Sequence, residues 1–301
     1  MRKSTFLVLC IIAVTAVVFS AGCNKTPSVK YPDTVRRIIG TNPQFSILDS
    51  GITIAYISNA IDSSGVTFFA PDNDAFAASG LTETMIAAMP VQTLKNMFKY
   101  GIVFPAIDTS AFPVSDSIRS FEGALLFISH NANGIFVNGI KIKTGDMVAT
   151  NGFIDVVSQV LMPPTFSIQN TIAADTSLSL FADALIKIGL WSSLNLPAKY
   201  TVFAPVNNAF RAAGFLTTTQ INSAADTTIQ RIVNNHIIGT NVFTSDFTNG
   251  GQITNLEGNI LIEGISGTIQ LTGSGNPPSN ILTPNILTTN GVVHKIYSIL
   301  E

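Results

Sequence analysis

Residue types that could support catalysis or metal binding are few and scattered in this chain of 301 residues. Its three histidines, His130, His236 and His294, form no pair at the spacing of helical zinc ligands. Asp72-Asn73-Asp74 resembles the start of a calcium-binding loop, but the glycine that such a loop needs at its sixth position is missing. We interpret the acidic segment as a helix cap and His236 and His294 as structural residues, and we predict no metal site and no cofactor.

Catalytic motifs are also lacking. The sequence contains no Gly-x-Ser-x-Gly turn, no phosphate-binding loop and no dinucleotide fingerprint. Only 18 residues are acidic, so a carboxylate pair for glycoside hydrolysis has little support. Charged residues make up 11% of the chain and the formal net charge is −2, unlike the basic surface that nucleic-acid binding requires. We predict a non-enzymatic protein that binds no nucleic acid and whose surface consists mainly of Ser, Thr, Asn and Gln.

The N-terminal segment has the features of an export signal. A pair of basic residues precedes an apolar run from Phe6 to Phe19, and the small residues Ser20-Ala21-Gly22-Cys23 follow. This order is typical of a secretory signal peptide. The apolar run is shorter than a comfortable membrane span, which takes about 20 residues. Residues 1–22 are therefore predicted to be removed as a lipoprotein signal peptide, and residues 23–30 to form a tether.

Cys23 is the candidate lipid-attachment residue. Ala21-Gly22-Cys23 resembles a bacterial lipobox, in which cleavage before the cysteine is accompanied by acylation of its sulfur. Cys10 lies within the predicted signal peptide, so the mature chain would form no internal disulfide. More than one acyl chain suffices for stable anchoring. We predict an exported, lipid-anchored protein of the bacterial cell envelope, at the periplasmic or the surface face of the outer membrane; an ordinary signal peptide with Cys23 near the cut is the alternative.

The chain repeats itself over the length of a domain. Residues 67–76 return in similar form at 201–210, a shift of 201 − 67 = 134 residues. Asn151-Gly152 and Asn290-Gly291 recur with a similar shift near the end of each half. A period of this size is that of a whole domain rather than of a solenoid repeat. The predicted domains are residues 31–164 and 165–301.

Each half is predicted to begin with helices and to continue with strands. Apolar residues three and four apart in segments 45–61 and 178–188 have the spacing of amphipathic helices. The repeated apolar run, 66–70 and again 200–204, indicates a buried strand that a proline ends. After a second helical pattern, broken at Pro90, short apolar runs and Asn-Gly turn pairs indicate antiparallel strands up to Leu161 and Leu300. This order of elements favours an α+β fold.

The repeated signatures resemble those of a known family. Residues 201–210 resemble the first signature of the fasciclin (FAS1) domain, and residues 290–300 resemble its closing signature. Residues 151–163 match the closing signature as well, with Asp155 at the usual histidine. The resemblance covers nearly all of residues 34–301. It implies two FAS1 domains, each a wedge-shaped β-sandwich of two sheets with several helices along one edge.

A Tyr-His pair often lies between the two family signatures and has been linked to adhesion and core integrity in relatives. This chain splits the pair, since Tyr100 is followed by Gly101 and His236 follows Asn235. The resemblance implies a secreted or membrane-anchored adhesion or matrix-binding module without a shared catalytic site. Whether the split pair retains an adhesion role is left open.

Two functions follow as hypotheses. The first is a membrane-anchored adhesion or matrix-binding module that binds an extracellular protein or polysaccharide with both domains. The alternative is an accessory carbohydrate-binding surface lipoprotein for nutrient uptake, with exposed aromatic residues as a sugar platform. Loop 273–280 is a further candidate for ligand contact, although a solvated connection is the simpler interpretation. The candidate platform residues are Tyr56, Tyr100, Trp191, Tyr200 and Tyr297.

Overall fold

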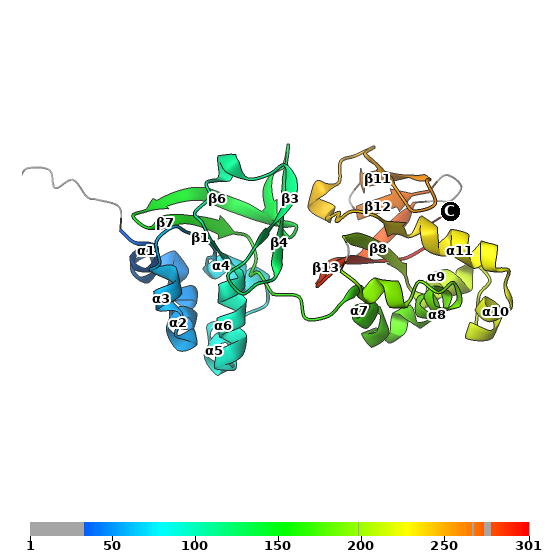
Figure 1. Ribbon diagram of the computed structural model, residues 1–301, viewed down its shortest axis with the longest axis horizontal. Coiled ribbons are helices and arrows are strands. Elements are labelled where there is room, and N and C mark those ends of the chain that lie inside the picture. The colour runs from blue at the N-terminus through cyan, green and yellow to red at the C-terminus, as the bar shows by residue number, and fades with distance from the viewer. Residues whose placement is uncertain (1–32, 198, 267, 274–277, 301) are drawn as a thin grey trace, which may run out of the picture. The chain divides into compact units, whose positions relative to one another are not determined.

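The structure, a computed structural model, describes residues 33–300 apart from residues 198, 267 and 274–277. Cys23, the predicted signal peptide and the predicted tether lie outside these residues. Two similar domains follow each other along the described chain, and each has helices packed on a bent seven-stranded sheet (Figure 1). The prediction of an α+β fold repeated in two domains is confirmed.

Three helices of the first domain begin at residues whose side chains cap them. Thr34, Asp72 and Thr82 each accept a hydrogen bond from a backbone N–H in the first turn that follows, which satisfies donors that the helix leaves free. The predicted capping role of Asp72 is therefore confirmed, and Pro90 separates two helices as expected. The helical elements are α1 (Val35–Thr41), η1 (Pro43–Phe45), α2 (Ser46–Ala55), α3 (Ser58–Ile61), α4 (Asn73–Ala78), α5 (Glu83–Ala88), α6 (Val91–Tyr100) and η2 (Thr109–Ala111).

Seven strands form the first sheet in the order β2-β1-β7-β6-β5-β4-β3. They are β1 (Val66–Pro71), β2 (Ile102–Val103), β3 (Ser115–Arg119), β4 (Leu125–Asn131), β5 (Gly134–Val137), β6 (Ile140–Ala149) and β7 (Gly152–Val157). Strand β6 carries two register shifts between Ile142 and Met147, and irregularities of this kind bend a strand. A backbone bridge between Val103 and Ser120 joins the two edges, so the sheet nearly closes on itself.

The second domain repeats this arrangement. Its helical elements are α7 (Ile168–Ala174), η3 (Thr176–Leu178), α8 (Ser179–Lys187), η4 (Ser192–Asn195), α9 (Asn207–Ala212), α10 (Thr218–Ser223), α11 (Asp226–Asn235) and η5 (Thr244–Asp246). Its strands follow the order β10-β11-β12-β13-β14-β8-β9. They are β8 (Tyr200–Pro205), β9 (Ile237–Ile238), β10 (Gln252–Thr254), β11 (Ile260–Ser266), β12 (Thr268–Thr272), β13 (Ser279–Thr288) and β14 (Gly291–Ile296).

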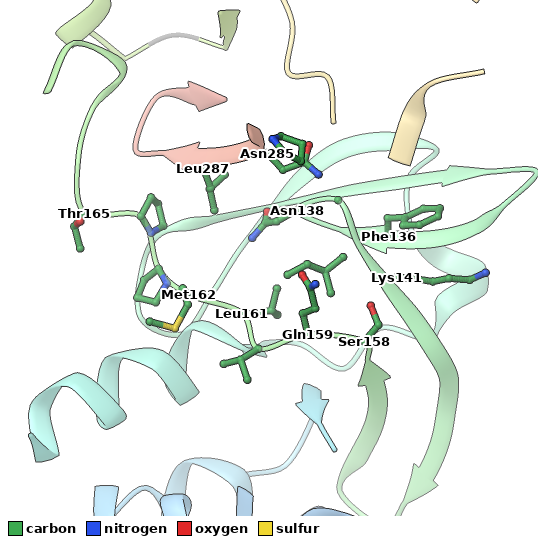
Figure 2. Close-up of a pocket in the computed structure, with 16 residues that line it drawn as sticks. Phe136, Asn138, Lys141, Ser158, Gln159, Leu161, Met162, Thr165, Asn285 and Leu287 are labelled. Atoms are coloured by element: carbon green, nitrogen blue, oxygen red, sulfur yellow. The ribbon is translucent and has the colours of Figure 1, made fainter. Parts of the chain in front are cut away.

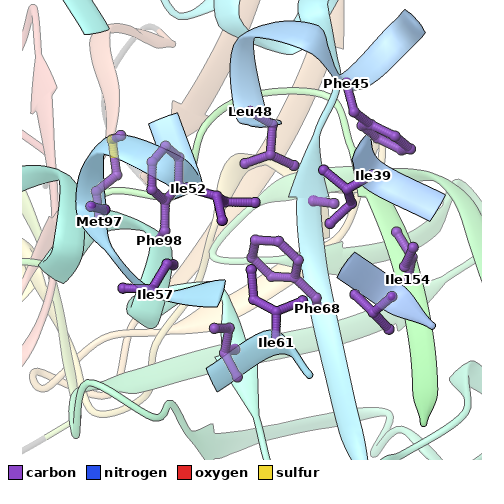
Figure 3. Packing of buried hydrophobic residues seen from close by; sticks show 14 of the residues in the cluster. Ile39, Phe45, Leu48, Ile52, Ile57, Ile61, Phe68, Met97, Phe98 and Ile154 are labelled. Carbon is purple, nitrogen blue, oxygen red and sulfur yellow. The ribbon is translucent and has the colours of Figure 1, made fainter. Parts of the chain in front are cut away.

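Two apolar clusters stabilise each domain. In the first domain, one lies between the helices and the sheet and contains Phe68 and Phe98 (Figure 3). The other contains Phe69 and is lined by strands from both halves of the bent sheet. Phe68 and Phe69 are neighbours on β1 and point to opposite faces, so this strand belongs to both clusters. Val202 and Phe203 on β8 divide in the same way in the second domain, so the repeated apolar run is buried on both faces.

The asparagine of each Asn-Gly pair ties helices to the sheet. Asn151 accepts a hydrogen bond from the backbone N–H of Val35 at the start of α1 and donates to the carbonyl oxygens of Ile61 and Ser63. Asn290 makes the same three kinds of bond in the second domain. The signature asparagine therefore satisfies backbone groups at both ends of the helical lead-in.

Other polar residues of the repeated signature are also used inside each domain. Asn73 and Asn207 each accept from a backbone N–H and donate to a carbonyl in the preceding helical segment. Thr67 and Thr201 each donate to a carbonyl and accept from a backbone N–H in the segment that follows β2 or β9. The signature thus consists of internal hydrogen-bonding groups as well as core residues.

The closing strand of each domain differs from the prediction in two ways. β7 ends at Val157 and β14 at Ile296, earlier than the predicted ends at Leu161 and Leu300. Each also pairs in parallel with the repeated strand, β1 or β8, in addition to its antiparallel partner. The sequence indicated antiparallel strands only, because a parallel pair joins segments far apart in the chain and leaves no turn signal.

A glycine is required where the parallel strands meet. A Cβ at Gly152, whose φ is +153°, would lie 1.7 Å from the carbonyl oxygen of Val66. At Gly291, with φ +157°, a Cβ would lie 2.0 Å from the carbonyl oxygen of Tyr200. Neither position accepts a side chain unless the two strands separate.

We expect Gly152→Ala to lower the free energy of unfolding of the first domain by more than about 3 kcal/mol, because the added methyl group clashes with the backbone of β1. Gly80→Ala is the matched control, since Gly80 also has a positive φ (+68°) but a Cβ there meets nothing within 4 Å. Its cost should be about 1 kcal/mol. Urea unfolding followed by circular dichroism measures both variants, and equal losses would contradict the explanation from close approach.

Candidate functional site

Tyr100, the tyrosine of the split pair, lies inside the first domain. Its side chain is fully buried, and its hydroxyl donates to the carbonyl oxygen of Leu125 (2.8 Å) and accepts from Nδ2 of Asn138 (2.8 Å). Burial raises the pKa of Tyr100, so the phenol stays neutral. Asn138, in the turn between β5 and β6, also accepts from the backbone N–H of Phe127. Tyr100 therefore fastens this turn to α6.

His236, the histidine of the split pair, is fully buried in the second domain. The backbone N–H of Leu300 donates to its Nε2 (2.9 Å), so the ring proton is on Nδ1, which lies 2.6 Å from the carbonyl oxygen of Ile232. Burial lowers the pKa of His236 to about 4. The histidine therefore joins the end of α11 to the last residues of the described chain, which is the structural role that the sequence suggested.

The positions beside these two residues also lie in the interior. A Cβ at Gly101 would lie 2.9 Å from the carbonyl oxygen of Phe69. Asn235 is buried and accepts hydrogen bonds from the side chains of Asn255 and Asn259. The split pair is thus part of the interior in both domains, and neither side chain is exposed to a partner in this conformation.

Asp155 and His294 occupy the same position in the two closing strands. Asp155 Oδ1 accepts from the backbone N–H of Asp146 (2.8 Å), and His294 Nδ1 accepts from that of Asn285 (3.2 Å); both donors have a left-handed backbone. His294 Nε2 bonds the carbonyl oxygen of Val242, whereas Oδ2 of Asp155 is buried without a partner among the described residues. Burial raises the pKa of Asp155 to about 7 and lowers that of His294 to about 4.

Side chains of the two domains meet at a contact with an apolar centre. Leu287 of β13 packs against the cluster inside the first sheet. The rings of Phe127 and Phe243 have centroids 6.0 Å apart. Beside them, Nδ2 of Asn131 donates to the carbonyl oxygen of Ser245 (2.9 Å). The junction therefore brings side chains of both domains to one place.

A cavity of about 610 Å³ lies at this junction, beside the segment that links the two domains (Figure 2). Its lining includes Asn138, Asn285, Leu287 and the linker segment 162–165. The amide of Asn138 already bonds Tyr100 and a backbone N–H, and that of Asn285 bonds groups of its own domain. These two asparagines therefore have little capacity left for a ligand.

A second cavity of about 150 Å³ adjoins an open groove of about 420 Å³. Both are lined by Ser115 and Ser129 of the first domain and by Thr240, Asn241 and Asp246 of the second, and we call this region the junction cleft. Three polar atoms here, Ser129 Oγ and both amide atoms of Asn241, are buried without a partner among the residues that the structure describes. Free hydrogen-bonding capacity thus gathers in the junction cleft.

The junction cleft is acidic. Among the described charged side chains that line it, Asp116, Asp246 and Glu263 are carboxylates and Lys199 is the ammonium group. Lys199 Nζ lies 3.7 Å from Asp116 Oδ1 in an exposed pair, which contributes little to stability. Burial raises the pKa of Glu263, and the nearby Asp246 carboxylate adds to this shift. Three carboxylates against one ammonium group disfavour an anionic ligand.

The aromatic residues proposed as a sugar platform do not form one. Tyr56 is 83% exposed and Tyr297 is also exposed, whereas Tyr100 is buried. Trp191 and Tyr200 are half-buried against the helix–sheet core of the second domain. No ring contact joins any of the five to another within the described ranges.

An exposed aromatic pair occurs where the sequence did not indicate one. Phe104 and Phe121 meet edge to face with centroids 5.5 Å apart, and Lys99 Nζ lies 4.9 Å from the centre of the Phe121 ring. The pair belongs to segments separated by β3, so only the folded chain brings the two rings together. Phe104 is 37% exposed and Phe121 is 46% exposed. The sequence pattern around them does not predict this partial exposure.

The remaining predictions concern metals, membranes and the second-domain loop. Within the described part of the chain, no three His, Cys, Asp or Glu side chains are grouped to hold a metal ion. No helix there has both the length and the apolar composition to span a bilayer. Of loop 273–280, residues 274–277 lie outside the description, and so does the lipid-attachment candidate Cys23. His130 lines the groove of the junction cleft and is exposed.

Comparison with known proteins assigns the family. The fasciclin domain model matches residues 43–163 and 176–301, so the chain belongs to the fasciclin domain family and contains the domain twice. The chain is 29% identical to transforming growth factor-beta-induced protein ig-h3 of Sus scrofa over 238 residues, 78% of this chain and 34% of that protein. It is 30% identical to human periostin over 240 residues, 78% of this chain and 28% of periostin. The chain thus spans about a third of the length of these relatives.

Two further similarities concern smaller proteins. Protein sll1483 of Synechocystis is 31% identical over 134 residues, which cover 44% of this chain and 74% of that protein. Among solved structures, a FAS1 domain pair from the insect cell adhesion molecule fasciclin I aligns with 88% of this chain and 96% of that chain. Its TM-score is 0.42 and its sequence identity 14%.

Asp155 leads us to expect that the first domain becomes less stable as the pH rises. Below about pH 4 the carboxyl is protonated in both folded and unfolded chains. Between about pH 4 and 7 the unfolded chain loses the proton and the folded chain keeps it, so the free energy of unfolding falls, by up to about 4 kcal/mol. Asp155→Asn should abolish this dependence. Hydrogen exchange of β1 and β7 amides, corrected for intrinsic rates, measures it; an unchanged slope would argue against the buried carboxyl.

The second domain should respond in the opposite direction. Above about pH 6.5, His236 and His294 are neutral in both states. As the pH falls toward 4 only the unfolded chain gains protons, so the free energy of unfolding falls, by up to about 3 kcal/mol per histidine. Urea unfolding followed by Trp191 fluorescence should show a lower midpoint at about pH 4.5 than at about pH 7. His294→Asn should reduce the difference, and a midpoint independent of pH would show that the histidines are not buried.

Proposed function

We propose that this chain is an exported, membrane-anchored and non-enzymatic adhesion or matrix-binding module that recognises a protein or polysaccharide through its tandem fasciclin domains. The observation that carries the proposal is the match of both halves of the chain to the fasciclin domain, whose family resemblance implies adhesion or matrix binding. Two linked domains on one chain raise the effective concentration of the second contact once the first has formed.

The distribution of polar side chains supports recognition rather than catalysis. The signature residues are used for internal hydrogen bonds, and the split pair Tyr100 and His236 is buried. Unpaired polar atoms gather instead in the junction cleft, which takes residues from both domains. A ligand bound there would need the two domains together, which fits a tandem module.

The anchor is proposed from the sequence alone. The apolar run from Phe6 to Phe19 followed by Ala21-Gly22-Cys23 resembles the signal of a bacterial lipoprotein. Acylation at Cys23 would hold the domains at the cell envelope, in our proposal at the outer membrane, through the tether of residues 23–30.

An accessory carbohydrate-binding role in nutrient uptake is the second candidate. The exposed pair Phe104 and Phe121, with Lys99 over one ring, is the observation that favours it, since aromatic faces can carry sugar rings. This role and adhesion differ in the ligand, which is a soluble sugar in one case and an immobile surface in the other.

Adhesion can be tested with cells that display the full chain, the chain without residues 165–301, or no chain. We expect attachment to isolated matrix to fall at least about tenfold when the second domain is removed, because avidity is lost. If cells with the shortened chain attach as well as cells with the full chain, a role for the tandem is contradicted. If cells with the full chain attach no better than cells without the protein, adhesion itself is contradicted.

The anchor is tested separately by mass spectrometry of the mature N-terminus. We expect an acylated peptide that begins at Cys23, and Cys23→Ser should release the protein from the membrane fraction. Ser20→Ala is the control, since it alters the same segment without removing the thiol. An unmodified Cys23 in the membrane-bound protein would contradict lipid attachment.

A further inference from the structure

We propose that the junction cleft binds a neutral sugar residue of a polysaccharide, with Asn241 and Ser129 as its main hydrogen-bonding groups. The inference rests on the proposed function and narrows its ligand to carbohydrate. It also assigns the ligand to a site shared by both domains, since Ser129 belongs to β4 and Asn241 to the segment after β9.

The first support is the unpaired polar atoms. Both amide atoms of Asn241 and the hydroxyl of Ser129 are shielded from solvent and bond no other described residue. A buried polar group without a partner costs about 1–3 kcal/mol, so three in one place call for a reason. A ligand would satisfy all three if it offered an acceptor to Nδ2 of Asn241, a donor to Oδ1 of Asn241 and any polar group to the hydroxyl of Ser129.

The second support comes from the repeat. Thr67 and Thr201 are equivalent, and each accepts a hydrogen bond from a backbone N–H: that of Ile107 in the first domain and that of Val242 in the second. Ile107 and Val242 are therefore equivalent, and so are the residues that precede them. That residue is Asn241 in the second domain and Ala106 in the first. The same fold is therefore built without an amide at this position in the first domain.

The chemistry of the lining favours a sugar. Neighbouring hydroxyl groups of a sugar both donate and accept, which matches the donor and acceptor of one amide, while the carboxylate of Asp246 can accept from a further hydroxyl. Phe127 and the buried Phe243 line the same cavity, and the half-buried ring of Phe127 offers an apolar surface to the carbon face of a sugar ring. Polar side chains and an aromatic surface therefore line the same cavity, and a sugar presents both kinds of group.

Charge and size narrow the ligand further. Three carboxylates against one ammonium group disfavour acidic polysaccharides, so the proposal is restricted to a neutral ligand. The inner cavity of about 150 Å³ admits a single small group, and the adjoining groove of about 420 Å³ is within the usual range of about 300–1,000 Å³ for ligand sites. One sugar unit would enter the cavity while its neighbours lie along the groove.

Isothermal titration of the full two-domain chain with four neutral probes, cellotetraose, laminaritetraose, mannotetraose and chitotetraose, tests the site. We expect at least one probe to bind, and Asn241→Ala to weaken its binding at least about tenfold, in line with the loss of hydrogen bonds worth about 1.4 kcal/mol. Asn195→Ala, an exposed asparagine that lines none of the cavities described above, should leave binding unchanged. Binding by no probe, or equal binding by Asn241→Ala, would overturn the proposal.

Thermal unfolding of Asn241→Ala separates recognition from folding. Because both amide atoms are unpaired, we expect the unfolding temperature to stay the same or to rise. A clear fall would show that Asn241 supports the fold and would overturn the proposal. Loss of sugar binding at unchanged stability is the combination that a merely structural residue does not produce.

Displayed on cells, the same variant distinguishes this inference from the broader function. If cells with the wild-type chain attach and cells with Asn241→Ala do not, the cleft proposal is supported. If both attach equally, the cleft proposal fails and adhesion stands. If neither attaches more than cells without the protein, the proposed function fails as well. Attachment that is lost after protease treatment of the matrix but kept after periodate oxidation would identify a protein ligand and overturn the sugar assignment.

Discussion

The fold of each domain depends on the parallel contact between its closing strand and its repeated strand. β7 lies between β1 and β6, and β14 lies between β8 and β13, so this contact joins the beginning of each domain to its end. The close approach is possible because Gly152 and Gly291 have no side chain. Asn151 and Asn290, one residue earlier, bind the helices to the same place. The Asn-Gly signature therefore serves one structural purpose in both domains.

This use of the signature limits where recognition can take place. A side chain that saturates its hydrogen bonds inside the domain has little left for a partner, and this applies to the signature asparagines as well as to Tyr100 and His236. The fold tolerates either of two solutions at one shared position, which holds Asp155 in the first domain and His294 in the second. Burial raises the pKa of Asp155 and lowers that of His294, although the architecture of the two domains is the same.

The junction adds something that neither domain has alone. Beside its apolar contact lies a polar cleft to which both domains contribute. Unpaired atoms in that cleft are a cost to stability, and natural proteins retain such costs mainly at sites that bind or react. The association of two similar domains, rather than the surface of either, is therefore the source of the proposed recognition.

Much of the architecture was predictable from the sequence alone. The duplication, the order of helices before strands, the buried repeated strand and the capping role of Asp72 follow from local patterns, because burial and capping leave a periodic or positional signal in neighbouring residues. The parallel pairing of the closing strand, the exposed meeting of Phe104 and Phe121 and the junction cleft around Asn241 were decided only by tertiary structure. Each joins residues far apart in the chain, and long-range contacts of this kind have no periodicity from which they can be predicted.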